Sequence, residues 1–154
     1  MPHDTYDEAT IAGVLNRVKT VAMIGASANI NRPSYFVIKY LTAKSYTVHP
    51  VNPGLAGQEI LGRHVYASLV DVPAPVDMVD IFRNSEAAHE ITREAIALKD
   101  KLGIKVIWMQ LSVRNDTAAE KRWYNGKIGT ITQISAHGVE VRCPGEDERI
   151  LVER

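Results

Sequence analysis

Short apolar segments alternate along this chain with longer segments that have the period of an amphipathic helix. Residues 21–24 are all apolar and are followed by Gly25, which is typical of a strand buried on both faces of a sheet. Three more strands are predicted over residues 46–51, 76–82 and 104–109. Because helical segments of ten or more residues separate these strands in two places, we expect parallel strands, right-handed crossovers and helices on both faces.

Three helices are predicted around these strands. The first covers residues 5–19 and starts with a capping-box pattern from Thr5 to Glu8. The second starts at Pro33, a residue that suits the first turn of a helix, and runs to about residue 44. The third is capped by Ser85 and continues to Gly103. The order of elements indicates an α/β fold, a Rossmann-like three-layer sandwich with a mainly parallel sheet.

Two parts of the chain have less regular patterns. Residues 59–62 are interpreted as a small excursion, and residues 67–72 as a short helix ended by Pro73. After the fourth strand, Asn115 and Asp116 can cap another helix to about residue 124, and residues 139–141 predict a last strand. Between them, residues 125–138 contain three glycines among β-branched residues. They fit either a hairpin or a mobile loop.

Length and charge limit the kinds of protein this chain can be. Its 154 residues suit one domain over residues 1–154. The 18 basic and 18 acidic residues balance, so no overall positive field attracts nucleic acid or an anionic membrane. No apolar run approaches the roughly 20 residues that span a bilayer, and the first ten residues lack the pattern of a secretion signal. We therefore expect a cytoplasmic protein. Cys143, the only cysteine, excludes an internal disulfide and a multi-thiolate zinc site.

The loops that follow the strands are the first place to look for a binding site. In a parallel sheet they meet at one crevice, because ligands bind at the carboxyl ends of the strands. The four loops begin at Gly25, Asn52, Phe82 and Met109. The first leads from a strand into a helix, where free backbone N–H groups and the helix dipole favour a phosphate. Gly25 lets the backbone approach closely, and Ser27 adds a hydroxyl; a plainer interpretation is that Gly25 serves the tight turn alone.

A nicotinamide dinucleotide is disfavoured on two counts. Its usual fingerprint has three glycines spaced as G-x-G-x-x-G and an acidic residue about 20 positions later. The loop after residue 24 has one glycine, and the second strand ends with Asn52 where the acid is expected. A phosphate-binding P-loop is absent too, since no Gly-Lys-Ser or Gly-Lys-Thr occurs.

Five ordered blocks of the sequence share one family pattern. They are residues 21–27 with Asn29 and Arg32-Pro33-Ser34-Tyr35, then residues 51–54, 57–62, 76–83 and 106–111. These blocks cover about residues 19–121 and closely resemble the coenzyme A-binding domain family, in particular its small stand-alone bacterial members. Larger relatives are the α subunits of succinyl-CoA synthetase and the ADP-forming acyl-CoA synthetases. Residues 122–154 diverge from the pattern, although Arg142-Cys143-Pro144 matches it.

The resemblance implies a ligand and the residues that hold it. The ligand is coenzyme A or an acyl-CoA, whose phosphates would meet Gly25, Ala26 and Ser27. It also implies that Asn52 and Pro53 border the nucleotide, and that Phe82 and Arg83 close the other side near the adenine or the pantetheine. Arg32, Pro33 and Ser34 complete the predicted set. Arg32 and Arg83 can pair with phosphate, with a solvated surface arginine as the plainer alternative for each.

No residue in these loops stands out as catalytic. None of the five histidines forms a spaced ligand pair, so no metal site is predicted, and Asp77 and Asp80 are interpreted as fixing strand ends. The leading hypothesis is a binding protein for this nucleotide-type small molecule, without its own catalytic centre, acting as a sensor, carrier or regulatory partner. The alternatives are an enzyme or enzyme subunit acting on acyl-CoA thioesters, and an NAD(P)-binding oxidoreductase-like protein. General frequencies favour a homodimer.

Overall fold

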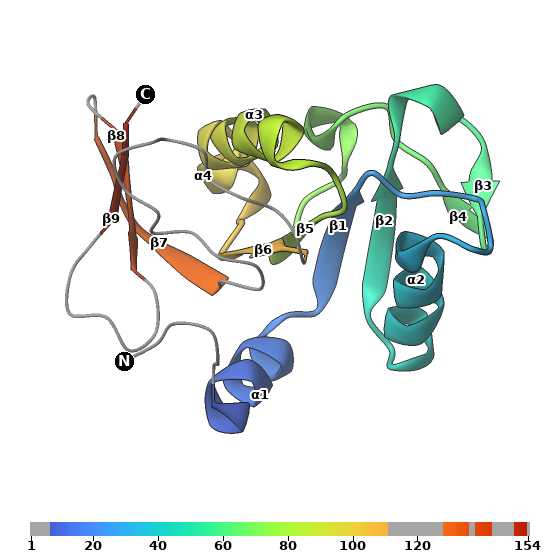
Figure 1. The fold of residues 1–154 in the computed structure, drawn as a ribbon, viewed down its shortest axis with the longest axis horizontal. Helices are drawn as coiled ribbons and strands as arrows, with labels where there is room; N and C mark the ends of the chain where they lie inside the picture. The colour runs from blue at the N-terminus through green and yellow to red at the C-terminus, as the bar shows by residue number, and fades with distance from the viewer. Residues whose placement is uncertain (1–6, 111–127, 136–137, 143–149, 154) are drawn as a thin grey trace.

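The computed structural model describes residues 7–110, 128–135, 138–142 and 150–153. These residues form a seven-stranded sheet in the order β2-β1-β5-β6-β7-β8-β9 (Figure 1). The first four strands in that order are parallel: β2 (Thr47–Val51), β1 (Thr20–Ile24), β5 (Met78–Ile81) and β6 (Val106–Met109). The others add to β6 in antiparallel fashion: β7 (Ile128–Ser135), β8 (Gly138–Arg142) and β9 (Ile150–Glu153). The predicted α/β fold is confirmed: the parallel sheet is the four-strand part β2-β1-β5-β6, and the antiparallel strands extend it on one side.

Helices cover both faces of the parallel strands. Side chains of α1 (Glu8–Arg17) and α2 (Pro33–Ala43) pack with Val21 and Met23 on what we call the α2 face. Those of α3 (Ser85–Ala97) and α4 (Lys99–Leu102) pack with Ala22 and Ile24 on the opposite, α3 face. Because successive residues of β1 point to opposite faces and both faces are covered, residues 21–24 of the strand are all apolar and buried.

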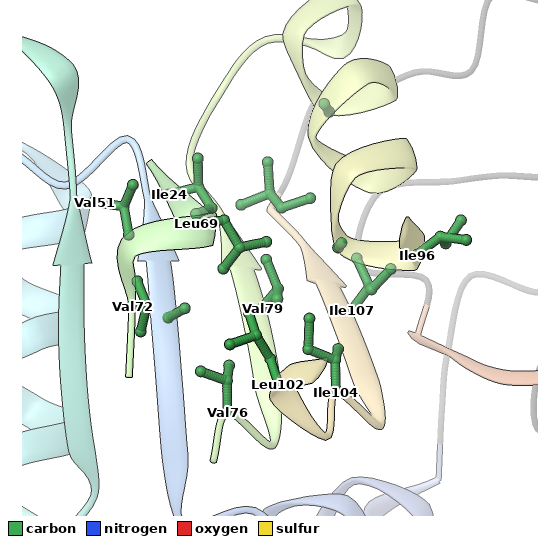
Figure 2. Close-up of a cluster of buried hydrophobic side chains, with 14 residues drawn as sticks. Ile24, Val51, Leu69, Val72, Val76, Val79, Ile96, Leu102, Ile104 and Ile107 are labelled. Carbon is green, nitrogen blue, oxygen red and sulfur yellow. The ribbon is translucent and has the colours of Figure 1, made fainter. Parts of the chain in front are cut away.

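The core of the α3 face shows how these layers meet. Figure 2 shows Ile24, Val79 and Ile107 gathered between the strands and the helices, with Leu69 from a short 3₁₀-helix beside them. That 3₁₀-helix, η2 (Leu69–Asp71), is the short helix predicted over residues 67–72. A buried side chain of this size contributes roughly 1.5–3 kcal/mol to folding. The α3 face is therefore held mainly by apolar packing.

The excursion predicted over residues 59–62 is present as a small hairpin. It consists of β3 (Glu59–Ile60) and β4 (Arg63–His64), which follow the 3₁₀-helix η1 (Pro53–Leu55). After the hairpin, Tyr66 lies along the outer side of β2, where its N–H donates to Pro50 O and its carbonyl accepts from Asn52 N–H, both at 2.9 Å. The second strand is thus partly covered on its free side.

Two predicted helix starts need correction. Asp7, and not Thr5, caps α1, because the Asp7 carboxylate accepts the Thr10 N–H at 2.6 Å; Thr5 lies outside the described residues. Asn84 caps α3, because its carboxamide oxygen accepts the Ala87 N–H at 2.9 Å, so Ser85 is the first helical residue. The predicted long third helix is also divided at Leu98 into α3 and α4. Its end at Gly103, in the left-handed conformation, is as predicted.

The C-terminal part resolves one open alternative. Of the two interpretations of residues 125–138, the hairpin is correct, since β7 and β8 pair from Thr130 with Arg142 to Ser135 with Gly138. The strand predicted over residues 139–141 is part of β8, and β9 was not predicted. The helix predicted from Asn115 to residue 124 lies outside the described residues. Within the described ranges, no helix has the length and apolar character that crossing a membrane requires.

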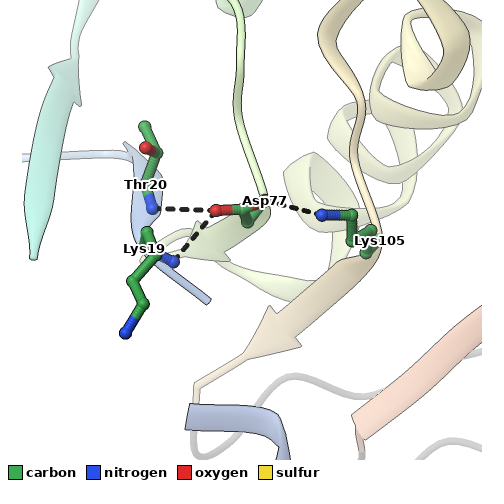
Figure 3. A network of polar contacts seen from close by, with 4 residues as sticks. All are labelled: Lys19, Thr20, Asp77 and Lys105. Carbon is green, nitrogen blue, oxygen red and sulfur yellow. Dashed lines mark hydrogen bonds and ion pairs between the residues drawn. The ribbon is translucent and has the colours of Figure 1, made fainter. Parts of the chain in front are cut away.

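Asp77 ties the amino ends of three strands together (Figure 3). Its carboxylate accepts the backbone N–H groups of Lys19 at 2.9 Å and Thr20 at 3.1 Å, and it forms an ion pair with Lys105 at 2.9 Å. Burial pushes the pKa of Asp77 upward, but these hydrogen bonds and the Lys105 charge outweigh burial and hold the pKa below its ordinary value. The sequence-based interpretation of Asp77 as a residue that fixes strand ends fits this geometry.

Asp77→Ala is expected to lower the free energy of unfolding by about 1–3 kcal/mol, because two backbone N–H groups lose their acceptor. Urea denaturation at pH 7 measures this loss. Since folding lowers the pKa of Asp77, its contribution to stability is present at pH values above the ordinary aspartate pKa and is lost as the pH falls through the folded-state pKa. The free energies of unfolding of wild type and Asp77→Ala should therefore become similar in acid. Lys105→Met is the control and should cost less than about 1 kcal/mol, because its ammonium group is largely exposed. Equal losses in both variants would mean that the ion pair dominates.

Candidate functional site

The sheet has a topological switch point between β1 and β5. These strands are neighbours, yet β1 continues into α2 on one face and β5 into α3 on the opposite face. The chain therefore diverges at their carboxyl ends, and such a divergence is where open α/β sheets bind ligands. The predicted loops at Gly25 and Phe82 both lie at this point.

Gly25 packs directly against the neighbouring loop. It has a φ of +84°, and a Cβ placed on it would lie 2.6 Å from the Phe82 carbonyl oxygen and 2.8 Å from Arg83 Cδ. The Phe82 N–H also donates to Ile24 O at 2.8 Å. A glycine is therefore required for the contact between the two loops, and this contact places the stem of Arg83 across Gly25. The plainer interpretation, that the backbone geometry requires a glycine at position 25, is therefore sufficient to explain this residue.

The amides of the three residues predicted to meet the phosphates, Gly25, Ala26 and Ser27, are not free, contrary to the sequence-based expectation. The N–H groups of Gly25 and Ala26 both donate to Val51 O, at 3.0 and 3.3 Å, and the N–H of Ser27 donates to Ser34 Oγ at 3.1 Å. Ala26 and Ser34 are buried. Ala26 and Ser34 therefore stabilise the conformation of the loop, because their polar groups already have partners within the protein. A phosphate at this loop must find most of its donors elsewhere.

Hydroxyl and guanidinium groups add further donors at this loop. Ser27 Oγ accepts the Asn29 N–H at 3.1 Å, which leaves the hydroxyl proton free to point to a ligand. Arg32, which precedes α2, and Arg83 are exposed, and within residues 7–110 neither guanidinium has a carboxylate partner. Pro33 is exposed at the first position of α2. Arg32 and Arg83 thus give the site a positive character, since neither has a carboxylate partner among the described residues.

Asn52 braces two of the loops. Its Nδ2 donates to Ala26 O and its Oδ1 accepts the Gly54 N–H, both at 2.8 Å. Both ends of the carboxamide are therefore occupied by the protein, and the acid that would bind a ribose in a nicotinamide site is replaced by a structural contact. The exposed Pro53 follows it in η1, and half-buried Phe82 packs on the α2 face. These two residues flank the switch point on either side.

A polar pair at the strand ends was not identified as part of the site from the sequence. Asp80, in β5, is 3% exposed, and its Oδ1 accepts the Gln110 Nε2 at 2.7 Å. Burial raises the pKa of Asp80 to about 7, although the hydrogen bond from Gln110 acts in the opposite direction. A charged residue within a strand buried on both faces is the sequence signal that singles out Asp80, since such residues need a partner.

Within residues 7–110, two of the histidines lie together away from these loops. His49, in β2, packs edge-to-face against Tyr66, with 5.6 Å between ring centroids, and burial lowers its pKa. His64 contacts the same tyrosine, with 4.8 Å between centroids. Across the part of the chain that the structure describes, no group of three or more His, Cys, Asp and Glu side chains is arranged to hold a metal ion.

Comparison with known structures places this fold among small proteins of the same architecture. A hypothetical protein from Pyrococcus horikoshii is 36% identical, with a TM-score of 0.66 over 77% of this chain and 80% of the other. A protein from Thermus thermophilus is 34% identical, with a TM-score of 0.63 over 71% of this chain and 79% of the other. The α/β fold is thus shared with proteins of similar size.

Sequence comparison identifies the family. The uncharacterized protein YneT of Bacillus subtilis is 32% identical over 111 residues, which are 72% of this chain and 78% of YneT. The acetate–CoA ligase (ADP-forming) II of Archaeoglobus fulgidus is 28% identical over 128 residues, which are 82% of this chain but 18% of the ligase. The family described as "CoA binding domain" matches residues 19–126, a range that starts at the residue where the resemblance begins. This chain therefore belongs to the CoA-binding domain family.

Proposed function

We propose that this protein binds coenzyme A, or an acyl-CoA, at the switch point and has no catalytic centre of its own. The observation that carries the proposal is the position of Arg83, whose stem lies across Gly25 and whose guanidinium has no carboxylate partner among residues 7–110. Coenzyme A carries a diphosphate and a 3′-phosphate, and a guanidinium binds such groups through charge-assisted hydrogen bonds. Membership of a CoA-binding family supports the same ligand.

In this proposal the predicted residues divide into contacts and supports. Arg83, Arg32 and the Ser27 hydroxyl contact phosphate oxygens. Pro33, Pro53 and Phe82 border the ligand through their exposed or half-exposed surfaces. Gly25, Ala26, Ser34 and Asn52 hold the loops in place, since their polar groups are bonded within the protein.

Such a protein would act in the cytoplasm as a sensor, a carrier or a regulatory partner of another protein. The chain spans 18% of the ADP-forming ligase that it matches, so the ligase reaction is proposed only as an alternative. Asp80 offers one argument for that alternative, because a carboxyl with a pKa of about 7 suits a general acid or base. Incubation of the pure protein with acyl-CoA thioesters, with and without ATP, tests it: measurable turnover would contradict a purely binding role.

Isothermal titration with coenzyme A, 3′-dephospho-CoA, NAD and NADP tests the binding proposal. We expect coenzyme A to bind most tightly and the dephospho form about tenfold or more weakly, because a charge-assisted phosphate contact contributes about 1.5–3 kcal/mol. Binding of NAD or NADP should be weakest, since Asn52 is not available to a ribose. Tightest binding of NAD would favour the oxidoreductase-like alternative and overturn the proposal.

A further inference from the structure

Asp80 and Gln110 connect two neighbouring strands at the edge where ligands bind. Gln110 directly follows β6, and its N–H donates to Ile81 O at 3.4 Å, so its backbone continues the pairing with β5. Its side chain reaches across to Asp80 on the α2 face, at 2.7 Å. Asp80 lies two residues before Phe82, which flanks the switch point. The pair therefore lies at the carboxyl ends of β5 and β6, beside the candidate site.

The chemistry of the pair determines which end of the carboxamide faces outward. An ionised carboxylate only accepts hydrogen bonds, so it holds the amide nitrogen of Gln110. The amide oxygen then points away from Asp80. Because Gln110 is half-buried while Asp80 is almost fully buried, Gln110 is the residue of the pair that a ligand can approach.

We propose that Asp80 is a positioning residue that fixes Gln110 with its amide oxygen toward the ligand site, so that the site accepts a hydrogen bond from an N–H group of the ligand. Coenzyme A offers such groups in the two amides of its pantetheine arm and in the amino group of its adenine. This inference rests on the proposed coenzyme binding. It adds a contact that favours ligands with an N–H donor over ligands without one.

Protonation of Asp80 would remove this preference. A neutral carboxyl can donate its proton to the Gln110 oxygen, so that the carboxamide can turn and present its nitrogen. Burial raises the pKa of Asp80 to about 7, which brings the change into the neutral range. Ligand affinity should therefore fall as the pH drops from 8 to 6.

The surroundings of Asp80 contain few other groups that titrate in this range. Its neighbours in the sheet are Met23 on β1 and Trp108 on β6, and neither carries a charge. The fully buried side chains of α1 and α2 are apolar except for Ser34, and the half-buried Tyr35 packs beside them. The guanidinium nearest in sequence is that of Arg83, which follows in the next loop and is exposed. Among the described residues, Asp80 is thus the group on this face expected to titrate near neutral pH.

The test is isothermal titration of wild type, Gln110→Ala and Asp80→Asn at pH 6, 7 and 8. The ligand is 3′-dephospho-CoA, because the 3′-phosphate of coenzyme A would itself titrate near pH 6. Wild type should bind about tenfold more weakly at pH 6 than at pH 8, as expected from the ionised fraction of a group with a pKa of about 7. Gln110→Ala should bind more weakly at pH 8 and without pH dependence. Asp80→Asn should also lose the pH dependence, because asparagine does not titrate and can hold either end of the carboxamide.

Two comparisons separate the possible outcomes. Melting temperatures at pH 8 show whether a variant is folded, and Asp80→Asn should melt no lower than wild type, since it removes a buried charge. Adenosine 3′,5′-bisphosphate, which lacks the pantetheine arm, shows which donor is bound: an unchanged affinity of Gln110→Ala for it assigns the contact to pantetheine, and a reduced one to adenine. Wild-type affinity of folded Gln110→Ala for 3′-dephospho-CoA, or a pH-independent wild type, would overturn the inference. Failure of wild type to bind any form of coenzyme A would overturn the proposed function itself.

Discussion

Gly25→Ala is expected to lower the free energy of unfolding by about 2–5 kcal/mol and to abolish coenzyme binding. The added methyl group would lie 2.6 Å from a backbone carbonyl oxygen, that of Phe82, which cannot move without shifting the loop into α3. Overpacking of this kind costs about 1–3 kcal/mol, and the left-handed backbone at φ +84° adds about 1–2 kcal/mol for a residue with a side chain. Urea denaturation and titration with coenzyme A measure the two effects.

Gly57→Ala is a matched control for this prediction. Gly57 has nearly the same φ, +81°, but nothing lies within 4 Å of an added Cβ. It should therefore show the backbone cost alone, about 1–2 kcal/mol, and leave binding unchanged. If both variants lose the same free energy of unfolding, the contact between Gly25 and the Phe82 loop contributes little to stability, and the close packing of the two loops does not require a glycine.

Arg83→Glu is expected to weaken coenzyme A binding by about 100-fold or more. The change removes a charge-assisted contact, which contributes about 1.5–3 kcal/mol, and places a negative charge beside the phosphates. Because the side chain is exposed and has no ion-pair partner within residues 7–110, the stability of the protein should change little. Titration calorimetry at fixed salt concentration gives the affinity, and a melting curve checks the fold.

The charge-matched control is Arg93→Glu, on the outer side of α3. Arg93 is 45% exposed in its side chain and lies near Glu90, away from the strand ends. It changes the net charge by the same amount, so any general effect of charge on an anionic ligand appears in both variants. Equal losses of affinity would show that Arg83 acts only through the overall charge. Arg83→Lys adds a finer measure, since lysine keeps the charge but not the two-pronged geometry of the guanidinium.

The four parallel strands were predictable because their burial on both faces leaves largely apolar runs in the sequence. Residues 21–24 are an example, and the observed β1 differs from the prediction by one residue. Helix starts were harder to predict, since Ser, Thr, Asp and Asn are all competent caps. At α3 the cap is Asn84 and not Ser85, because the Asn84 side chain accepts the Ala87 N–H.

The place of the candidate site was predictable, but the roles of its residues were not. The loops at Gly25, Asn52 and Phe82 meet as the rule for parallel sheets requires. Their hydrogen bonds, however, join residues far apart in the sequence: the Gly25 N–H donates to Val51 O, and Asn52 Nδ2 donates to Ala26 O. Such pairings depend on strand order and register, which no local pattern encodes. The Asp80–Gln110 pair has the same origin, because it requires β5 and β6 to be neighbours.

The antiparallel strand beside β6 has a consequence for how two copies of this protein could associate. β7 occupies the hydrogen-bonding edge of β6 from Val106 to Trp108, and Tyr66 occupies part of the free edge of β2. Exposed strand edges are where chains join into a shared sheet. Of the strands that the structure describes in the large sheet, β2 and β9 are the two terminal ones; β2 has only the bridge to Tyr66 on its outer side, and β9 has no partner strand there, so an intermolecular sheet that extends through β9 would form at the end of the sheet far from the switch point.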